Sequence, residues 1–193
     1  MYTPSHLEKW ISDRFIQMEI LYPSDLKREL IAKVFEVDYE SDLSPAFSGV
    51  EEGESFIVTD NRLSSEEQNE QFYHELCHVL LHEGNQNSMF QMFRLKQEFD
   101  AHLFTMYASI PFHMIDFSTG NTIRSLQQTF NVPYHIAKSR FEDIRRKLFI
   151  ASKQITNRRK KSHEISPYNL EKRSTETKRL IMQLNRQVGY KTI

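Results

Sequence analysis

The feature that most constrains this chain is an apolar helical stretch at residues 72–82 that carries the pattern His-Glu-x-x-His. An α-helix turns once in about 3.6 residues, so His74 and His78 project from one face and can offer two imidazole nitrogens to one metal ion. Glu75 is rotated off that face, but it stays close enough to hold and deprotonate a water molecule at the metal. The pattern therefore predicts a helix with a metal site of the kind that hydrolyses peptide bonds.

A third ligand is expected from the next helix, which periodicity predicts at residues 89–110. Glu98 lies 20 residues after His78, a separation that allows a second helix to fold back and point a carboxylate at the metal. Asp100 is two positions further on and should face roughly the opposite side of that helix. His102, one turn beyond Glu98 on the same face, is the second candidate, either as a ligand or as a partner that orients one.

Two further residues of the motif helix are expected to stay outside the ligand set. His82 lies two turns, or about 12 Å along the axis, from His74, which is too far for one ion to be gripped by all three histidines. It is expected to orient a ligand or to act as a charge at the helix C-terminus. Cys77 is expected to be a small packed hydrophobe rather than a redox switch. As the single cysteine of the chain it cannot form an internal disulfide, which fits a reducing compartment.

The rest of the chain alternates between helical and strand periodicity. Residues 5–21 predict an amphipathic helix with a capping pattern at Ser5 and Glu8, and a short helix follows through residues 26–31. The motif helix is expected from Ser64 to about Glu83, with Gly84 as its stop. Three short strands precede it, at residues 34–39, 46–50 and 55–59. The fold class is therefore α+β, with a small and mostly antiparallel sheet, the motif helix, a second helix bearing Glu98 and a helical C-terminal part.

Composition supports a packed domain and gives no overall electrostatic argument for binding nucleic acid or membrane. The chain has 193 residues, 39% of them hydrophobic, including 14 Phe and 8 Tyr. We expect the phenylalanines near the second helix to lie in the core, namely Phe90, Phe93, Phe99 and Phe104. The net charge of −1 gives no overall attraction to nucleic acid or membrane. Neither a signal peptide nor a run of about 18 apolar residues is recognisable, so a cytoplasmic location is expected.

Residues 74–82 followed by residues 98–111 resemble the ImmA/IrrE family of metallopeptidases. That family follows its His-Glu-x-x-His helix with a Glu-x-x-Ala-x-x-Phe-Ala helix that ends in an apolar run and often a proline. The residues in register with that pattern are Glu98, Ala101, Phe104 and Pro111. Cys77 stands where the family usually has glycine, and Thr105 where alanine is common. Both are small, so neither is expected to abolish the site.

The resemblance covers roughly residues 25–150 and implies a zincin-like domain. It implies one catalytic Zn²⁺ held by His74, His78 and Glu98, with Glu75 as the base. Family members act as cytoplasmic regulators of phages and integrative elements, so the implied function is a zinc-dependent, site-specific protease. Its substrate would be a helix-turn-helix repressor, which makes the protein an antirepressor.

A rival interpretation from another functional class is a non-enzymatic regulator with a metalloprotease-like fold. Such a protein would bind a transcription factor or DNA, and its zinc would serve structure only. Glu75 favours the enzyme, because a purely structural site has no need of a carboxylate beside an open coordination position.

Residues 112–153 are expected to form a helical cap on a metallopeptidase domain that spans residues 1–153. The cap's core would consist of Leu126, Phe130, Ile136, Phe141, Ile144 and Leu148. Two helices around residues 131–133 could instead read DNA as a helix-turn-helix, or form a repressor-docking surface. The phosphate contacts of the DNA reader would come from Ser139, Arg140, Arg145, Arg146 and Lys147. The cap is the favoured interpretation.

The final segment, residues 154–193, is expected to be a basic C-terminal extension. Residues 155–193 hold ten Lys and Arg against three Glu, an excess of plus seven, with a basic run at residues 158–161. A linker at residues 162–167 and a weakly amphipathic helix at about residues 170–184 are expected to follow. The extension is either a tether to an acidic partner, such as a DNA-bound repressor, or a solvated appendage.

Overall fold

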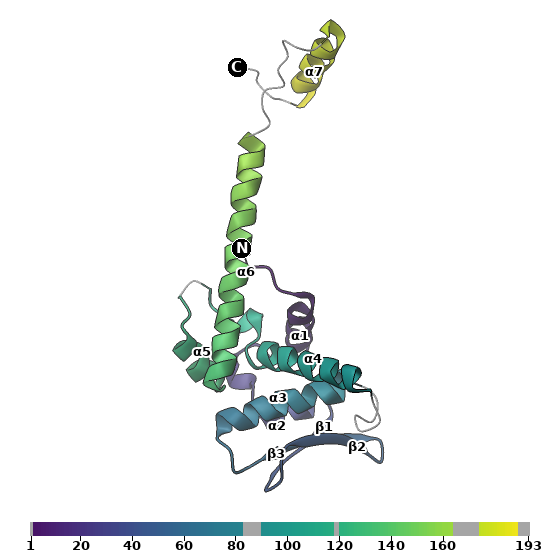
Figure 1. Cartoon of the computed structure of the whole chain (residues 1–193), viewed down its shortest axis with the longest axis vertical. Coiled ribbons are helices and arrows are strands. Elements are labelled where there is room, and N and C mark those ends of the chain that lie inside the picture. The colour runs from purple at the N-terminus through teal and green to yellow at the C-terminus, as the bar shows by residue number, and fades with distance from the viewer. Residues whose placement is uncertain (1, 83–89, 118–119, 164–173, 189–193) are drawn as a thin grey trace. The chain divides into compact units, whose positions relative to one another are not determined.

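The computed structural model describes residues 2–82, 90–117, 120–163 and 174–188, with the side chains of residues 154–163 and 184–188 left aside. The chain separates into two compact units, Met1–Phe149 and Ile150–Ile193. The helices and strands (Figure 1) are α1 (His6–Gln17), η1 (Pro23–Asp25), α2 (Arg28–Val34), β1 (Val37–Asp42), β2 (Phe47–Glu51), β3 (Glu54–Asp60), α3 (Ser65–Leu81), α4 (Gln91–Ser109), η3 (Phe112–Met114), α5 (Ile123–Phe130), α6 (Tyr134–His163) and α7 (Thr175–Val188). The fold class is α+β, as expected.

The sheet has three strands in the order β1-β3-β2 and is mixed. β1 runs parallel to β3, with Val37 opposite Ser55, while β2 runs antiparallel to β3, with Phe47 opposite Val58. The prediction of a mostly antiparallel sheet is therefore wrong. β3 lies between β1 and β2, so these two sequence neighbours do not pair. Alternation of apolar and polar residues predicts a strand, but it carries no information about the strand's partner.

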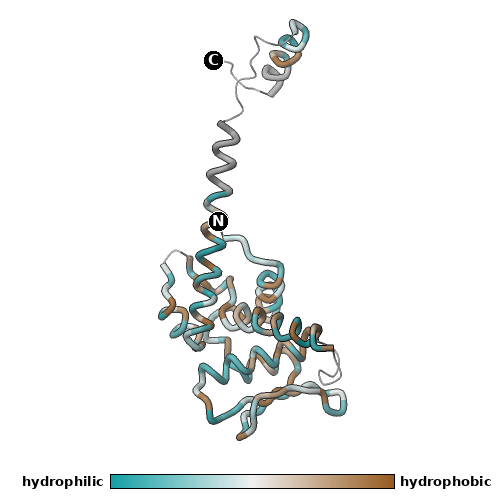
Figure 2. The backbone as a smooth tube through the Cα atoms, in the orientation of Figure 1, coloured by the Kyte–Doolittle hydropathy of each residue, from teal (hydrophilic) through white to brown (hydrophobic). Residues whose placement is uncertain are grey.

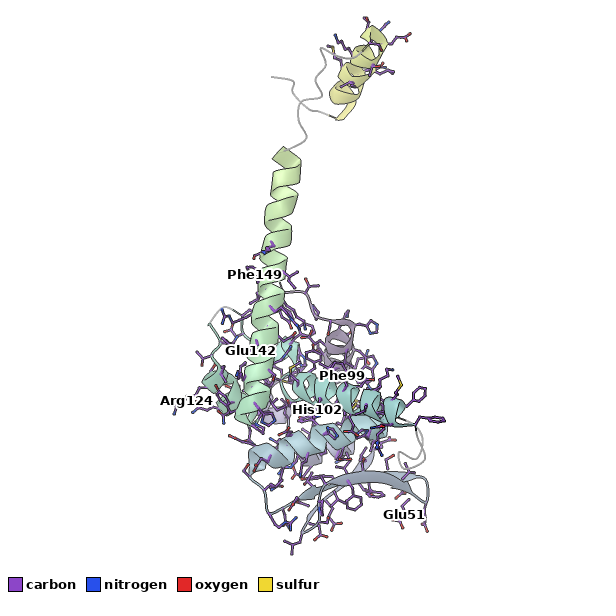
Figure 3. All side chains as sticks on the ribbon, in the orientation of Figure 1. Glu51, Phe99, His102, Arg124, Glu142 and Phe149 are labelled. Carbon is purple, nitrogen blue, oxygen red and sulfur yellow. The ribbon has the colours of Figure 1, made fainter. Side chains whose placement is uncertain are left out.

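A tight hairpin joins β2 to β3. Glu51 pairs with Glu54, and the two residues between them, Glu52 and Gly53, have φ angles of 53° and 91°. Two central residues with positive φ are typical of the type I′ turn, whose twist matches that of the flanking strands. Glu51, labelled in Figure 3, marks this end of the sheet.

The sheet, α3 and α4 follow one another as layers (Figure 1). α3 covers one face of the sheet, where the ring of Phe72 meets Tyr39 of β1 edge to face with centroids 5.2 Å apart. Ile57 in the central strand is completely buried. α4 then packs on α3, so that α3 is enclosed on two sides. The helix that carries the His-Glu-x-x-His pattern is thereby held rigidly from both sides.

α4 is divided into a buried and an exposed half. Ala101 and the residues from Phe104 to Ser109 are buried, whereas Phe90, Phe93 and Phe99 are 82%, 63% and 62% exposed. Hydrophobic colour also reaches the N-terminal end of α4 in Figure 2. The prediction that all four phenylalanines belong to the core is therefore wrong for three of them. Only the second half of α4 is covered by its neighbours, and aromatic content alone does not say where a helix stops being covered.

α1 begins with the predicted capping box. The Ser5 hydroxyl accepts from the backbone of Glu8, and the Glu8 carboxylate accepts from the backbone of Ser5 at 2.7 Å. That carboxylate also reaches α6, where it pairs with Arg140 at 2.6 Å and with Lys147. Asp143 completes the cluster, at 3.2 Å from Arg140 and 2.6 Å from Lys147. Buried charges thus connect the first helix of the chain with α6.

α5 and the first part of α6 bury most of the side chains that were expected to form the core of a cap. Leu126, Phe130, Ile136 and Ile144 are buried and Phe141 packs against the core, but Leu148 is exposed.

The cap is joined to α3 by hydrogen bonds. α5 ends at Asn131, which has φ 50° and ψ 56° and donates to the Ser65 hydroxyl at 2.9 Å, while the Asn131 carbonyl accepts from Asn69 at 2.8 Å. The start of α3 and the turn between α5 and α6 are therefore one hydrogen-bonded unit.

The second unit contains α7, which begins at Thr175 and exposes Leu180 and Met182. The expected stop at Gly84, residues 164–167 of the expected linker and the first residues of the expected helix from residue 170 lie outside the described residues, as do the side chains of the basic run. The linker was expected to begin at residue 162, which is wrong, because residues 162 and 163 still belong to α6. None of the helices in the described part of the chain is long and apolar enough to cross a membrane.

Candidate metal centre

α3 presents two histidines on the face opposite its buried side. Its N-terminus is fixed by a capping box in which Ser64 and Glu67 satisfy each other's backbone N–H groups. Leu76 and Cys77 turn into the core, which leaves His74 and His78 with side chains that are 22% and 10% exposed. Their Nε2 atoms face each other at 3.2 Å. The spacing of four residues thus produces the pair of imidazoles that the sequence predicted.

α4 brings Glu98 to the same point. Its Oε2 lies 3.2 Å from His74 Nε2, and its Oε1 lies 3.7 Å from His78 Nε2. One ligand atom from each of the three residues lies within 4.8 Å of the others. Among the described residues this is the group of His, Cys, Asp and Glu side chains that could hold a metal ion.

The three donors fit a tetrahedral zinc ion. With zinc–ligand distances of about 2.0–2.1 Å and tetrahedral angles, neighbouring ligand atoms should be roughly 3.3 Å apart. The two histidine Nε2 atoms are 3.2 Å apart, Glu98 Oε2 lies 3.2 Å from His74 Nε2, and the other oxygen, Oε1, lies 3.7 Å from His78 Nε2, so each pair of residues has donor atoms close to this spacing. Two imidazoles and a carboxylate are also the donor set of catalytic zinc sites, which keep a fourth position open. The residues present therefore suit this ion in both number and spacing.

The environment of His78 favours a neutral, ligating imidazole. Burial lowers the pKa of His78 to about 4, and the neighbouring His74 and His82 act in the same direction, against the opposing effect of Glu98. A histidine must be neutral to offer a lone pair to a metal. His78 is therefore ready to bind a cation at neutral pH.

Glu75 lies beside the three candidate ligands and is held by the sheet. Its Oε2 accepts a hydrogen bond of 2.7 Å from the Ser48 hydroxyl of β2. Burial raises the pKa of Glu75 above its usual range, and the charge of Glu98 adds to the increase, while Ser48 and His74 oppose it. A carboxylate with a raised pKa beside an open metal position has the properties of a general base.

His82 and His102 lie close to this group without joining it. His82 is the residue that follows the last residue of α3, and its Nδ1 is 2.9 Å from Nδ1 of His78, on the ring edge away from the cluster. His102, labelled in Figure 3, is exposed on α4, with its ring 5.3 Å from that of His74. Asp100 pairs with Lys96 at 3.8 Å. Both histidines are thus in a position to orient a ligand.

Cys77 and Thr105 occupy packing positions. Both are buried, and the Thr105 hydroxyl donates to the carbonyl of Ala101 at 2.8 Å. Burial raises the pKa of the Cys77 thiol to about 12. A thiol with that pKa is unreactive at neutral pH, which agrees with the expectation of a packed hydrophobe.

Ser48 is the site residue that the sequence reasoning missed. Alternation in β2 could have placed it on one face of the strand. It could not have shown that this face meets Glu75, because the two residues are 27 positions apart and the order of the strands was not predicted.

Comparison with known proteins places this site in a family. Residues 27–142 match the model of the peptidase M78 family, described as the IrrE N-terminal-like domain. The chain belongs to the ImmA/IrrE family. The family match includes all of β1 to α5 and therefore every member of the His74, His78, Glu98 and Glu75 group.

Two curated relatives from Bacillus subtilis (strain 168) agree with the ImmA/IrrE assignment. The uncharacterized protein YqaB is 29% identical over 152 residues, which cover 76% of this chain and 88% of YqaB. The phage-like element PBSX protein XkdA is 34% identical over 111 residues, which cover 58% of this chain and 56% of XkdA. No solved structure matches the chain.

Proposed function

We propose that this ImmA/IrrE family protein is a zinc-dependent, site-specific peptidase with a zincin-like fold. The observation that carries the proposal is the convergence of His74, His78 and Glu98, with Glu75 held beside them by Ser48. A metal-binding trio alone could serve structure. A half-buried carboxylate next to the trio adds the base that hydrolysis requires.

Each residue of the group has a distinct role in this proposal. His74, His78 and Glu98 would hold the zinc ion, which when bound supplies a Lewis acid that polarises a peptide carbonyl and acidifies water. Glu75 would take the proton from the attacking water and return it to the leaving amine. His82 would hold the His78 ring through their facing Nδ1 atoms, and His102 would restrict the ring of His74.

The proposed substrate is a helix-turn-helix repressor of a phage or mobile element, which would make the protein a cytoplasmic antirepressor. Support comes from the peptidase M78 family match and from the similarity to a protein of a phage-like element. Among the described residues, no helix is long and apolar enough to cross a membrane.

Contacts of the cap support its interpretation as part of the peptidase rather than as a DNA reader. In a helix-turn-helix, the N-terminal residues of the second helix contact base edges. Here His135, in the first turn of α6, pairs with Glu70 of α3 at 2.8 Å, and Gln127 of α5 donates to Glu66 at 3.2 Å. Acidic residues of α3 therefore adjoin the surface that DNA would have to approach.

The test is co-expression with the helix-turn-helix repressor encoded beside the gene, followed by detection of repressor fragments. The wild-type protein should give a discrete fragment. Glu75→Gln should give none while it retains zinc, and Glu98→Ala should lose both zinc and cleavage. Zinc is measured on the purified proteins by elemental analysis. Cleavage by Glu75→Gln at the wild-type rate would refute the role of Glu75, and stable binding of intact repressor by the wild type would favour the non-enzymatic regulator.

A further inference from the structure

A serine of the edge strand holds the carboxylate next to the candidate metal centre. The Ser48 hydroxyl donates to Glu75 Oε2 at 2.7 Å, and both side chains are half-buried. We propose that Ser48 is a positioning residue that fixes the orientation of the Glu75 carboxylate. The inference rests on the proposed function, in which Glu75 handles the proton of the attacking water.

A glutamate in this position needs such a partner. The last torsion of a glutamate side chain is broad and roughly two-fold, so packing alone does not choose the direction of the two oxygens. Proton transfer requires the acceptor oxygen within about 2.6–3.2 Å of its donor, and small misplacements cost much of the rate. A hydrogen bond to Oε2 sets the plane of the carboxylate and thereby the direction of Oε1. Ser48 thus supplies the orientation that α3 by itself cannot.

The position of Ser48 is fixed in turn by the packing of β2. Ser48 stands opposite Ile57, a buried residue of the central strand, so its side chain is on the face that α3 covers. On the other face the rings of Phe47 and Phe56 meet edge to face, with centroids 5.7 Å apart. Gly49 lies directly against the Phe56 ring.

Gly49 permits this arrangement because it lacks a side chain. A Cβ added at Gly49 would lie 2.8 Å from Cζ of Phe56, so any larger residue here would make the end of the ring move. In the described chain β2 pairs with β3 and lies at the edge of the sheet. The aromatic contact therefore adds to the pairing with β3 and to the packing of α3 that hold this edge strand in place. It keeps the Ser48 hydroxyl within reach of Glu75.

A pair of isosteric substitutions tests the role of the hydroxyl. Ser48→Thr keeps the hydroxyl, and Ser48→Val has the same shape without it; both residues suit a strand. In the repressor-cleavage assay, we expect Ser48→Val to lower kcat about ten- to a hundredfold with KM little changed, since a hydrogen bond to a charged group is lost. Ser48→Thr should stay within about threefold of the wild type. Ser55→Ala, on the same face of the sheet, is the matched control.

The zinc content of Ser48→Val should equal that of the wild type, because the hydrogen bond of Ser48 goes to Glu75 and not to His74, His78 or Glu98. A loss of kcat without a loss of zinc separates positioning from a general structural defect. Equal kcat in Ser48→Val and Ser48→Thr would overturn the proposal, and so would equal impairment of both.

A crystallographic readout keeps the test independent of cleavage. In crystals of the zinc-loaded wild type the Glu75 carboxylate should lie within hydrogen-bond distance of Ser48 Oγ, and in Ser48→Val it should be rotated or disordered. An unchanged carboxylate in Ser48→Val would refute the inference even if the protein cleaves nothing. If the carboxylate moves as expected but the wild type cleaves no repressor, the proposed function fails and the positioning contact stands.

Discussion

In the buried ion cluster between α1 and α6, the Glu8 carboxylate makes the stability of this protein depend on pH, and the perturbation that reveals this is Glu8→Gln. Burial alone would raise the pKa of Glu8. Arg140 and the hydrogen bonds from Lys147, Tyr2 and Ser5 outweigh it and lower the pKa from 4.5 to about 2. Glu8 is almost completely buried, so solvent screens these interactions little.

The sign of the pH dependence follows from the direction of that shift. Because the folded state binds the Glu8 proton more weakly than the unfolded state, ionised Glu8 stabilises the fold above pH 4.5, and the contribution disappears as the pH falls through about 2. At about 1.4 kcal/mol for each pH unit, the contribution at neutral pH is about 3 kcal/mol. A similar loss, of about 3–5 kcal/mol, is expected when a buried ion pair loses one partner.

The assay is urea unfolding of metal-free wild type and Glu8→Gln, in EDTA, at intervals between pH 2 and pH 7. We expect the free energies of unfolding to differ by about 3 kcal/mol at pH 7 and to converge as the pH approaches 2. Asp13→Asn is the control, since Asp13 lies on α1 in an exposed pair with Lys9 and should show little dependence. A Glu8→Gln difference that stays constant between pH 2 and pH 7 would refute the reasoning.

Two further substitutions test the surroundings of the candidate centre. His82→Ala removes the partner whose Nδ1 lies 2.9 Å from His78 Nδ1, and it should weaken zinc binding about tenfold in a chelator competition; an unchanged affinity would leave His82 with a role only at the helix end. Gly49→Ala should cost about 1–2 kcal/mol in urea unfolding, because the new Cβ displaces the Phe56 ring, and the double variant Gly49→Ala/Phe56→Leu should recover part of that loss. No recovery in the double variant would show that the Phe56 ring is not what opposes alanine.

Local periodicity predicted most of the helices and the candidate site. His74 and His78 could be chosen because their spacing of four residues places them on one face of a single helix. Glu98 could be chosen because it stands in register with a family pattern. The structure brings those three side chains together, and their function as ligands stays a prediction. Helix and strand positions agree within a few residues, since caps such as Ser5 and Ser64 mark where helices begin.

Contacts between residues far apart in the sequence could not be predicted from local periodicity. Glu8 was recognised as a capping residue, but its pairing with Arg140 across 132 residues has no local pattern. Arg140 was considered for phosphate contacts in the DNA-reader alternative, yet its guanidinium is completely buried, with its centre 4.9 Å from the Tyr107 ring. Burial of a charged residue is a property of the assembled fold, and charge in a sequence is most often at the surface. The position of β3 between β1 and β2 was missed for the same reason.

The division of α4 into an exposed and a buried half determines where its ligand can stand. Glu98 lies one turn before Ala101, which is completely buried where α4 packs on α3. Glu98 Oε2 is therefore held 3.2 Å from His74 by the first well-covered turn of the helix, while the turns before it are exposed. The distance between the helices at this turn, more than the sequence of the exposed half, should control metal affinity.

Ala101→Leu tests that dependence, because the added carbons have no space in a close-packed interior and should push α4 away from α3. We expect a stability loss of about 1–3 kcal/mol and a zinc affinity at least tenfold lower, although all three candidate ligands are retained. Met92→Leu, in the exposed half, is the control and should leave both quantities unchanged. Zinc competition and urea unfolding measure the two effects. If Ala101→Leu binds zinc as tightly as the wild type, the spacing of α3 and α4 does not set the ligand geometry, and Glu98 must reach the histidines through its own flexible side chain.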